Sequence, residues 1–368
     1  MSSRSPAVVA IALALTLGLA ACGGEEREAA STQKEAPAAT AEAQDLAAIK
    51  TYLLQHTQRL VAETAALRAD ATAYHALAEK ANFDYERLLA DDRAAVRAFV
   101  RDGQEGFARA NPAYEEMEGV VAGVPELADY DVIIDAGGDA SDPETAVPFN
   151  LRTPAGKTFK QPGNFNYLIE TSLFGTEPKW AAPKVEPDLD DDGRVEFGEA
   201  MPDADFYLAA TQEFERNAKE LDAASRRWSP TPQDAFTALV VMTPTMSEYF
   251  GAWKNSRYVA GSRADEKAFV VNSRLQDIED ILSGLELVYA NVEPRIAKES
   301  PEQAEQTAAS LTELRRSVAR LRREEANGRR FTAEEADALG SEAQGRAEAI
   351  AAQVSQSARR LNIKLETS

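Results

Sequence analysis

Histidine and cysteine are the scarcest reactive residues of this chain, which has two histidines and one cysteine in 368 residues. His56 and His75 fall in one helical stretch, where their separation corresponds to a rise of about 28 Å, so they cannot share a metal ion. The sequence contains neither a His-Glu-x-x-His nor a Gly-x-Ser-x-Gly motif. These absences argue against a zinc hydrolase and against a histidine-based catalytic triad.

The single cysteine, Cys22, directly follows a segment with the features of a secretory signal. Arg4 supplies a positive charge, residues 8–19 form an apolar run too short to span a membrane, and small residues precede the cysteine. This pattern resembles a bacterial lipobox, which predicts cleavage after residue 21 and lipidation of Cys22. Lipidation leaves no free thiol, which excludes disulfides and cysteine catalysis. We expect a lipid anchor at Cys22 to hold the protein on a bacterial membrane, in the cell envelope, facing the periplasm or the exterior.

The mature chain is strongly acidic and begins with a polar segment. Residues 22–43 are rich in Gly, Glu, Ala, Thr and Ser, which predicts a flexible tether. The net charge of −21 becomes −22 when the signal segment 1–21, with one arginine and no acidic residue, is removed. We therefore expect no binding to nucleic acid and no electrostatic docking on anionic lipid.

Apolar residues recur at helical spacing through most of the remaining chain. A seven-residue repeat of Leu46, Leu53, Leu60, Leu67 and Tyr74 predicts a long bundle helix. Further helices are expected at about 84–109, 203–227, 233–258 and 270–290. The pattern predicts an all-α fold with two packed four-helix-bundle-like lobes, residues 44–228 and 229–368.

Local signals refine this organisation. Asn111-Pro112 indicates the start of a new helix. Ser300 with Gln303 and Thr332 with Glu335 have the spacing of capping boxes that open two C-terminal helices. Residues 123–186 lose the helical period, and we expect a small hairpin of residues 147–153 and 157–161 and a short helix at 167–174.

Residues 188–199 match the twelve-position calcium loop of an EF-hand. Acidic residues occupy positions 1, 3, 5, 9 and 12, and Gly193 stands at position 6, where the chain turns sharply. Position 7 ligates through its backbone carbonyl, so an arginine there is compatible with the site. The predicted Ca²⁺ ligands are Asp188, Asp190, Asp192, Arg194, Glu196 and Glu199. Pro183, Pro187 and Pro202 argue against long flanking helices, and the single copy indicates a structural clip rather than a paired sensor.

Other acidic residues lie upstream of this loop. Glu115 and Glu118 are one helical turn apart and face the same way. Asp131 and Asp135 follow in the irregular segment, and Tyr167 precedes Glu170 by three residues. Spacing alone favours a solvated acidic face over a binding site.

Several short motifs resemble those of the imelysin-like family in order and spacing. They lie at residues 114–118, 131–135, 167–175, 253–257, 272–277 and 331–335. The resemblance covers about 46–368. The family includes a metallopeptidase group and the periplasmic or lipoprotein component of Efe-type bacterial iron uptake. It implies two four-helix bundles with a metal site in the cleft between them.

The family hallmark in that cleft is Gly-x-His-x-x-Glu, and this chain departs from it. Tyr167 stands where the histidine is expected, while Glu170 is retained. The resemblance then implies an all-oxygen cleft site with the candidate ligands Glu115, Glu118, Asp131, Asp135, Tyr167 and Glu170. Oxygen donors favour hard cations such as Ca²⁺ or oxidised iron over zinc.

These observations favour a lipid-anchored, metal-binding protein of iron acquisition or envelope metal handling, with Ca²⁺ in the loop, iron in the cleft and an iron-transport partner. No residue is nominated as catalytic, because the histidine is replaced. A metallopeptidase of the imelysin type stays open as an alternative. So does non-catalytic binding of an anionic polysaccharide or a protein partner by the arginine-rich helix at 315–323, although arginines in such a stripe more often pair with local acids such as Glu324 and Glu325.

Overall fold

The computed structural model of the chain describes residues 46–366. The expected signal segment, the tether and Cys22 lie outside the described residues. All of the described residues belong to one compact unit. Its elements, in chain order, are α2 (Ala47–Lys80), α3 (Tyr85–Val121), α4 (Ala128–Asp131), the π-helix η1 (Val132–Ala136), β1 (Asn150–Arg152), β2 (Thr158–Lys160), α5 (Phe165–Phe174), η2 (Pro178–Trp180), α6 (Ala204–Arg227), α7 (Pro232–Met242), η3 (Thr243–Thr245), α8 (Met246–Asn255), α9 (Arg257–Ala260), η4 (Gly261–Arg263), α10 (Arg274–Glu299), α11 (Pro301–Ala326) and α12 (Ala333–Arg360).

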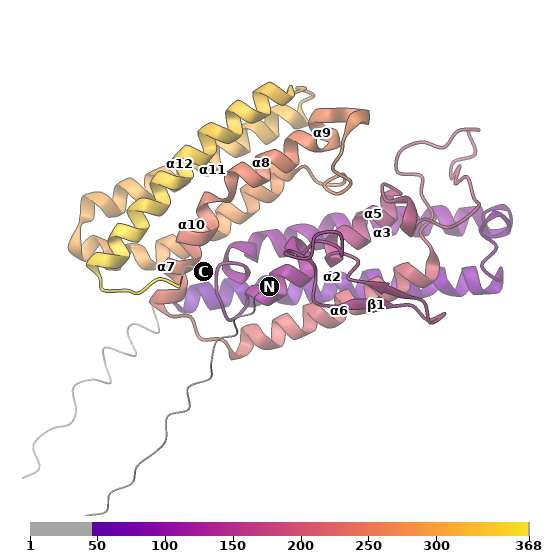
Figure 1. Cartoon of the computed structure of the whole chain (residues 1–368), viewed down its shortest axis with the longest axis horizontal. Helices are drawn as coiled ribbons and strands as arrows, with labels where there is room; N and C mark the ends of the chain where they lie inside the picture. Colours follow the sequence, from indigo (N-terminus) through magenta and orange to yellow (C-terminus); the bar gives the residue numbers. More distant parts are fainter. Residues whose placement is uncertain (1–45, 367–368) are drawn as a thin grey trace, which may run out of the picture. The chain divides into compact units, whose positions relative to one another are not determined.

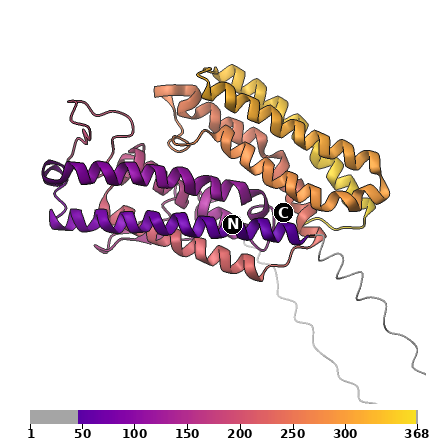
Figure 2. The same cartoon turned by 180° about the vertical axis from the view of Figure 1, so that it is seen from behind.

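The predicted all-α fold is confirmed, and its helices form two groups within the compact unit. In Figures 1 and 2, α2, α3 and α6 run alongside one another, and α8, α10, α11 and α12 form the second group. The division into lobes at residue 228 stays a prediction. No helix within residues 46–366 combines the length and the apolar character that crossing a bilayer requires.

The heptad stripe of α2 forms part of the core, as predicted. The five stripe residues are at most 1% exposed, because α2 packs along both α3 and α6. The two histidines lie on the flanks of this helix and bind its neighbours. His56 Nδ1 lies 2.8 Å from Glu116 Oε2, and His75 Nε2 lies 2.9 Å from Asp205 Oδ1.

The helix start expected at Asn111-Pro112 is wrong, because α3 continues through the proline to Val121. Proline at this position removes one backbone hydrogen bond inside the helix. Asn111, Pro112, Ala113 and Tyr114 are all buried, so packing around this turn outweighs that local cost. The consequence is that Glu115 and Glu118 lie in the last two turns of a long helix rather than on a separate short one.

The irregular middle of the chain contains the predicted hairpin and the predicted short helix. β1 pairs antiparallel with β2, and Leu151 lies opposite Phe159. α5 begins two residues earlier than expected, at Phe165, where the Asn164 side chain caps it by accepting from the Tyr167 amide. No long helix enters the loop 188–199, as its preceding prolines predict, but the 24-residue helix α6 begins at Ala204, shortly after Pro202.

The C-terminal helices differ from the sequence signals at three points. The helix expected at 270–290 is α10, which starts at Arg274 and continues through Pro294 to Glu299. The stretch expected at 233–258 is divided into α7 and α8, because Pro244 takes a non-helical conformation in η3 between them. Thr332 and Glu335 form the predicted capping box. Ser300 does stand at the start of α11, but its side chain makes no capping bond, and Gln303 instead donates to the carbonyl of Gln353.

α3 and α10 approach closely where the two groups of helices meet. A Cβ atom added to Gly284 on α10 would lie 2.6 Å from the backbone oxygen of Glu116 on α3, and one added to Gly119 would lie 2.9 Å from Leu285 Cδ2. Glycine at these positions therefore permits the contact. It also brings the first turn of α10 beside the carboxylates of α3.

Candidate metal centre

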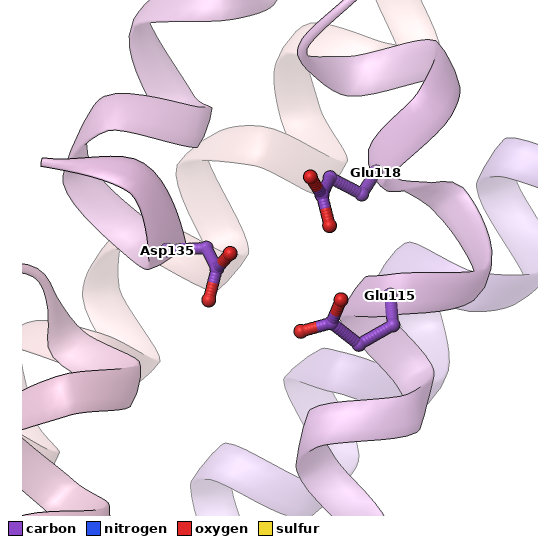
Figure 3. A group of neighbouring side chains, drawn as sticks. All are labelled: Glu115, Glu118 and Asp135. Atoms are coloured by element: carbon purple, nitrogen blue, oxygen red, sulfur yellow. The ribbon is translucent and has the colours of Figure 1, made fainter. Parts of the chain in front are cut away.

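Three buried carboxylates form a compact group between α3 and η1. Glu115 is 0% exposed, Glu118 is 3% exposed, and the side chain of Asp135 is 7% exposed. One carboxylate oxygen from each lies within 4.8 Å of the others. Figure 3 shows the three carboxylates directed toward one another across the space between the two elements. We refer to Glu115, Glu118 and Asp135 as the carboxylate group.

Amide and phenol donors orient each member of the carboxylate group. Asn111 donates to Glu115 Oε1 over 2.7 Å, Asn166 donates to Asp135 Oδ1 over 3.0 Å, and Tyr249 donates to Glu118 Oε1 over 2.7 Å. The other oxygen of Glu118, Oε2, is buried and has no hydrogen-bond partner. A buried carboxylate oxygen without a donor is costly, and a bound cation would satisfy it.

Asp131, expected in the site, lies beside the carboxylate group rather than in it. Its Oδ1 accepts a hydrogen bond of 2.6 Å from the phenol of Tyr114. Burial, followed by the charges of Glu118 and Asp135, holds the pKa of Asp131 well above its ordinary value. Asp131 therefore tends toward its neutral form and does not join the nearest set of carboxylate oxygens.

Arg274, which the sequence did not nominate, is the cation of this region. It is 5% exposed at the first turn of α10. Its NH1 atom lies 3.2 Å from Asp277 Oδ2 and 3.4 Å from Glu115 Oε2, and its NH2 atom lies 3.8 Å from Asp135 Oδ2. The guanidinium lies over the rings of Tyr249 and Phe269, 4.5 and 4.4 Å from their centroids.

Arg274 is surrounded by more buried carboxylates than one positive charge can balance. The pKa values of Glu115, Glu118 and Asp277 are therefore above their ordinary values. Burial is the largest cause for Glu115, Glu118 and Asp277, and neighbouring carboxylates raise the pKa of each further. The charge of Arg274 lowers the pKa of each of the three carboxyls, yet the pKa of Asp277 still reaches about 7. Without further positive charge, Glu115, Glu118 and Asp277 therefore tend to take up protons, and a cation would take the place of those protons.

Glu170 and Tyr167 occupy different surroundings from those expected. Glu170 is 3% exposed, and its carboxylate accepts backbone hydrogen bonds of 2.7, 2.9 and 3.0 Å from Phe269, Val270 and Val271. Burial raises the pKa of Glu170 to about 7 despite these three donors. The Tyr167 phenol donates to Glu177 over 3.2 Å. The structure thus groups three of the six candidate ligands and leaves Asp131, Tyr167 and Glu170 outside.

A cavity of about 390 Å³ opens beside the carboxylate group. Its wall includes Asp135 of the carboxylate group and the two amide donors Asn111 and Asn166. Tyr167, Glu170 and Phe269 also line it. Its described lining contains four acidic residues, Asp135, Asp139, Glu170 and Glu266, and no lysine or arginine. The cavity is therefore suited to positively charged or neutral ligands.

The loop 188–199 is held by hydrogen bonds from its own amides to two of its carboxylates. Asp188 accepts hydrogen bonds from the amides of Asp191, Asp192 and Gly193, and Glu199 accepts from Leu189, Asp190 and Glu196. Gly193 has a φ of 87°, which glycine adopts without strain. Carboxylate oxygens of Asp188, Asp190 and Asp192 lie within 4.8 Å of one another.

Side chains attach this loop to α3 and α5. Arg93 on α3 donates to the carbonyl of Asp188 and lies 3.1 Å from Asp191 Oδ1. The amide of Gln104 donates to the carbonyls of Leu173 and Gly198. The loop is thus tied to the helix that carries Tyr167 and Glu170.

The arginine-rich face of α11 is only partly paired. Arg315 donates to Glu286 and Arg322 to Glu279, both on α10 and both over 2.6 Å. The expectation that Glu324 and Glu325 would pair with this stripe is wrong. Glu324 pairs instead with Arg329, and Glu325, which is buried, accepts from the indole of Trp253.

The family model described as Imelysin matches residues 39–357. A search of curated proteins finds no match. The matched region contains the carboxylate group, Arg274, the cavity and the loop 188–199. Since the family model spans most of the sequence, the chain belongs to the imelysin family.

Proposed function

We propose that this protein binds a hard metal cation at Glu115, Glu118 and Asp135, without catalysis, and serves iron acquisition or metal handling in the cell envelope. The observation that carries the proposal is the carboxylate group itself, with its oxygens within 4.8 Å and Glu118 Oε2 lacking a partner. Buried acids of like charge are unfavourable unless a cation or protons compensate them.

The donor set fits a hard cation. The three nearest ligands are carboxylates, and the flanking donors are amides and phenols. Oxygen ligands suit Ca²⁺, Mn²⁺ and oxidised iron, whereas zinc prefers nitrogen and sulfur. The cavity beside Asp135 leaves room for water molecules to complete the coordination sphere.

Catalysis by the family hallmark has little support in this chain. Both histidines are on α2 and contact Glu116 and Asp205. Glu170, the retained glutamate of the hallmark, is occupied by three backbone amides, so it is poorly placed to act as a general base. A peptidase predicts chelator-sensitive cleavage of unfolded substrates that Glu170→Gln abolishes, and finding such cleavage would overturn the non-catalytic assignment.

A second cation, Ca²⁺, is proposed at the loop 188–199 as a structural clip. Support comes from the twelve-position match and from the contacts of Arg93 and Gln104, which join the loop to α3 and α5. An isolated loop of this kind has the affinity of extracellular modules, roughly 10⁻⁴–10⁻³ M. The clip is expected to brace the region that carries Tyr167 and Glu170.

We also propose a location and a partner, and the support for both comes from the sequence. The lipobox-like segment supports an anchor at Cys22, and the acidic mature chain argues against a nucleic-acid partner. A protein of metal acquisition anchored in the envelope requires a transport partner in the same membrane system. Lipid labelling of Cys22 and its loss in Cys22→Ser test the anchor.

Metal analysis tests the central proposal. The lipid-free mature protein, purified in Ca²⁺, is dialysed against Mn²⁺ or Fe³⁺, and its bound metal is measured. A second metal beside the loop calcium is expected in the wild type and should be lost in a Glu115→Gln/Glu118→Gln variant. Glu116→Gln is the matched control, because Glu116 lies on the same turn of α3 but binds His56 and Arg59. Metal confined to the loop would refute the proposal.

A further inference from the structure

The position of Arg274 has a consequence for how the carboxylate group binds metal. Its guanidinium is 3.4 Å from Glu115 and 3.8 Å from Asp135, two of the three proposed ligands. Its shortest distance to these carboxylates, 3.2 Å, is to Asp277, which lies outside the group. The guanidinium therefore stands between Asp277 and the group, close enough to both to compensate their charge.

Several neighbours restrict where this guanidinium can move. It lies over the rings of Tyr249 and Phe269. Phe269 has a φ of 52° and donates its amide to Glu170, so the Glu170 carboxylate fixes one of the two rings. Tyr249 also donates to Glu118. The guanidinium is thus enclosed by aromatic rings, and movement toward Asp277 keeps its charge paired.

The contacts of Arg274 are charge contacts more than well-formed hydrogen bonds. Its distances to Glu115 and Asp135 exceed the usual range for charge-assisted pairs, and its buried Nε atom has no hydrogen-bond partner. Glu118 Oε2 also stays unpaired. Arg274 thus neutralises part of the negative charge of the carboxylate group but does not fill all of its hydrogen-bond positions. A second cation could still be bound by the remaining oxygens.

We propose that Arg274 is a built-in competing cation, which compensates Glu115 and Asp135 while no metal is bound and weakens metal binding at the carboxylate group. This inference rests on the proposed function, because it concerns the same site. A metal ion among the three carboxylates would lie near the guanidinium and be repelled by it. Arg274 then lowers the affinity of the site and stabilises the metal-free protein, so that bound metal can be released.

Calorimetric titration with Mn²⁺ at pH 8 tests the inference, since protons compete less with metal at this pH. The background carries Asp188→Asn and Asp190→Asn, which silence the calcium loop. Arg274→Gln should bind Mn²⁺ at least tenfold more tightly than this background, while Arg274→Lys, which keeps the charge, should remain close to it. Unchanged or weaker binding in Arg274→Gln would overturn the inference.

Thermal melting separates competition from a purely structural role. Arg274→Gln should melt at a lower temperature than the background without metal, and saturating Mn²⁺ should close that difference. A structural role alone would keep the difference at every Mn²⁺ concentration. If Arg274→Gln does not fold without metal, the inference requires Mn²⁺ to restore folding, and failure to restore it is evidence against the inference.

The two proposals fail in different ways. If neither the background nor Arg274→Gln binds Mn²⁺, the proposed function is wrong and the inference falls with it. If the background binds Mn²⁺ and Arg274→Gln binds it no better, the metal site stands and only the competing role of Arg274 is refuted. Binding by Arg274→Gln alone would support both.

Discussion

Asp280 on α10 provides a quantitative test of how burial controls the charges at the α3–α10 contact. Its Oδ2 atom is buried and has no hydrogen-bond partner. Burial is the largest cause that raises the pKa of Asp280 from 3.8 to about 7, followed by the charges of Asp277, Glu116 and Glu279, while Arg322 lowers it. We expect Asp280→Asn to stabilise the protein at pH 8 far more than at pH 5.

The size of the effect follows from linkage between ionisation and folding. A carboxyl whose pKa is raised in the folded state contributes stability below its unfolded pKa, and this stability is lost as the pH rises through the folded pKa. A rise from 3.8 to about 7 corresponds to about 4 kcal/mol over the whole range, at 1.36 kcal/mol per pKa unit. Roughly 2.5 kcal/mol of this falls between pH 5 and pH 8.

Urea denaturation of the wild type and Asp280→Asn at both pH values measures the difference. The free energy of unfolding of the variant, relative to the wild type, should rise by roughly 2.5 kcal/mol from pH 5 to pH 8. Any constant effect of the asparagine cancels in this comparison. Glu299→Gln removes an exposed carboxylate from the last turn of the same helix and is the matched control for net charge, with an expected change within about 0.5 kcal/mol.

The result that would refute this reasoning is an equal stability difference at the two pH values. It would mean that Asp280 is paired or hydrated in solution and that burial does not set its ionisation. A wild-type advantage that grows with pH would reverse the sign and would indicate a cation beside Asp280.

Three further predictions concern the loop, the helix contact and a helix start. Asp190→Ala should lower the melting temperature in 10 mM Ca²⁺, by the loss of up to about 3 kcal/mol of binding energy, and equal melting of the two proteins in Ca²⁺ would contradict the clip; melting in chelator is the control. Gly284→Ala should destabilise the protein to urea by about 1–3 kcal/mol, because the added Cβ would meet the Glu116 carbonyl at 2.6 Å; a more stable variant would show that the helices can separate freely. Thr332→Ala removes one side of a capping box and should cost about 1 kcal/mol in the same assay, whereas the matched Ser300→Ala, which removes no capping bond, should change stability by less than half as much.

Local patterns were sufficient to predict much of the fold. The α2 stripe, the hairpin, α5 and the capping box at Thr332 each depend on residues close together in the sequence. Pro112 misled the prediction, because its effect on an isolated helix is unfavourable, whereas in α3 the surrounding turn is buried. Tertiary packing, which a single local pattern does not reveal, decided this boundary.

The site was predictable only in part, for a related reason. Glu115 and Glu118 share a helix face, so their three-residue spacing already placed them together. Arg274 approaches Glu115 from 159 residues away in the sequence, and no pattern around it indicates burial. The amides that bind Glu170 are 99 to 101 residues downstream. Every residue except proline has a backbone amide, so the sequence does not mark which amides will bind a carboxylate. The hydrogen bonding of Glu170 could therefore not be predicted from composition or spacing.

The three hydrogen bonds from the amides of residues 269–271 to the Glu170 carboxylate have a consequence for the order in which the protein folds. They close a chain segment of about one hundred residues that includes α6, α7 and α8, and closing such a segment is entropically costly until the intervening helices are in place. During synthesis, α3 and η1 emerge long before Arg274. Any contact between α3 and η1 that forms before α10 is complete therefore lacks Arg274, and only metal ions or protons from solution could then compensate the three carboxylates.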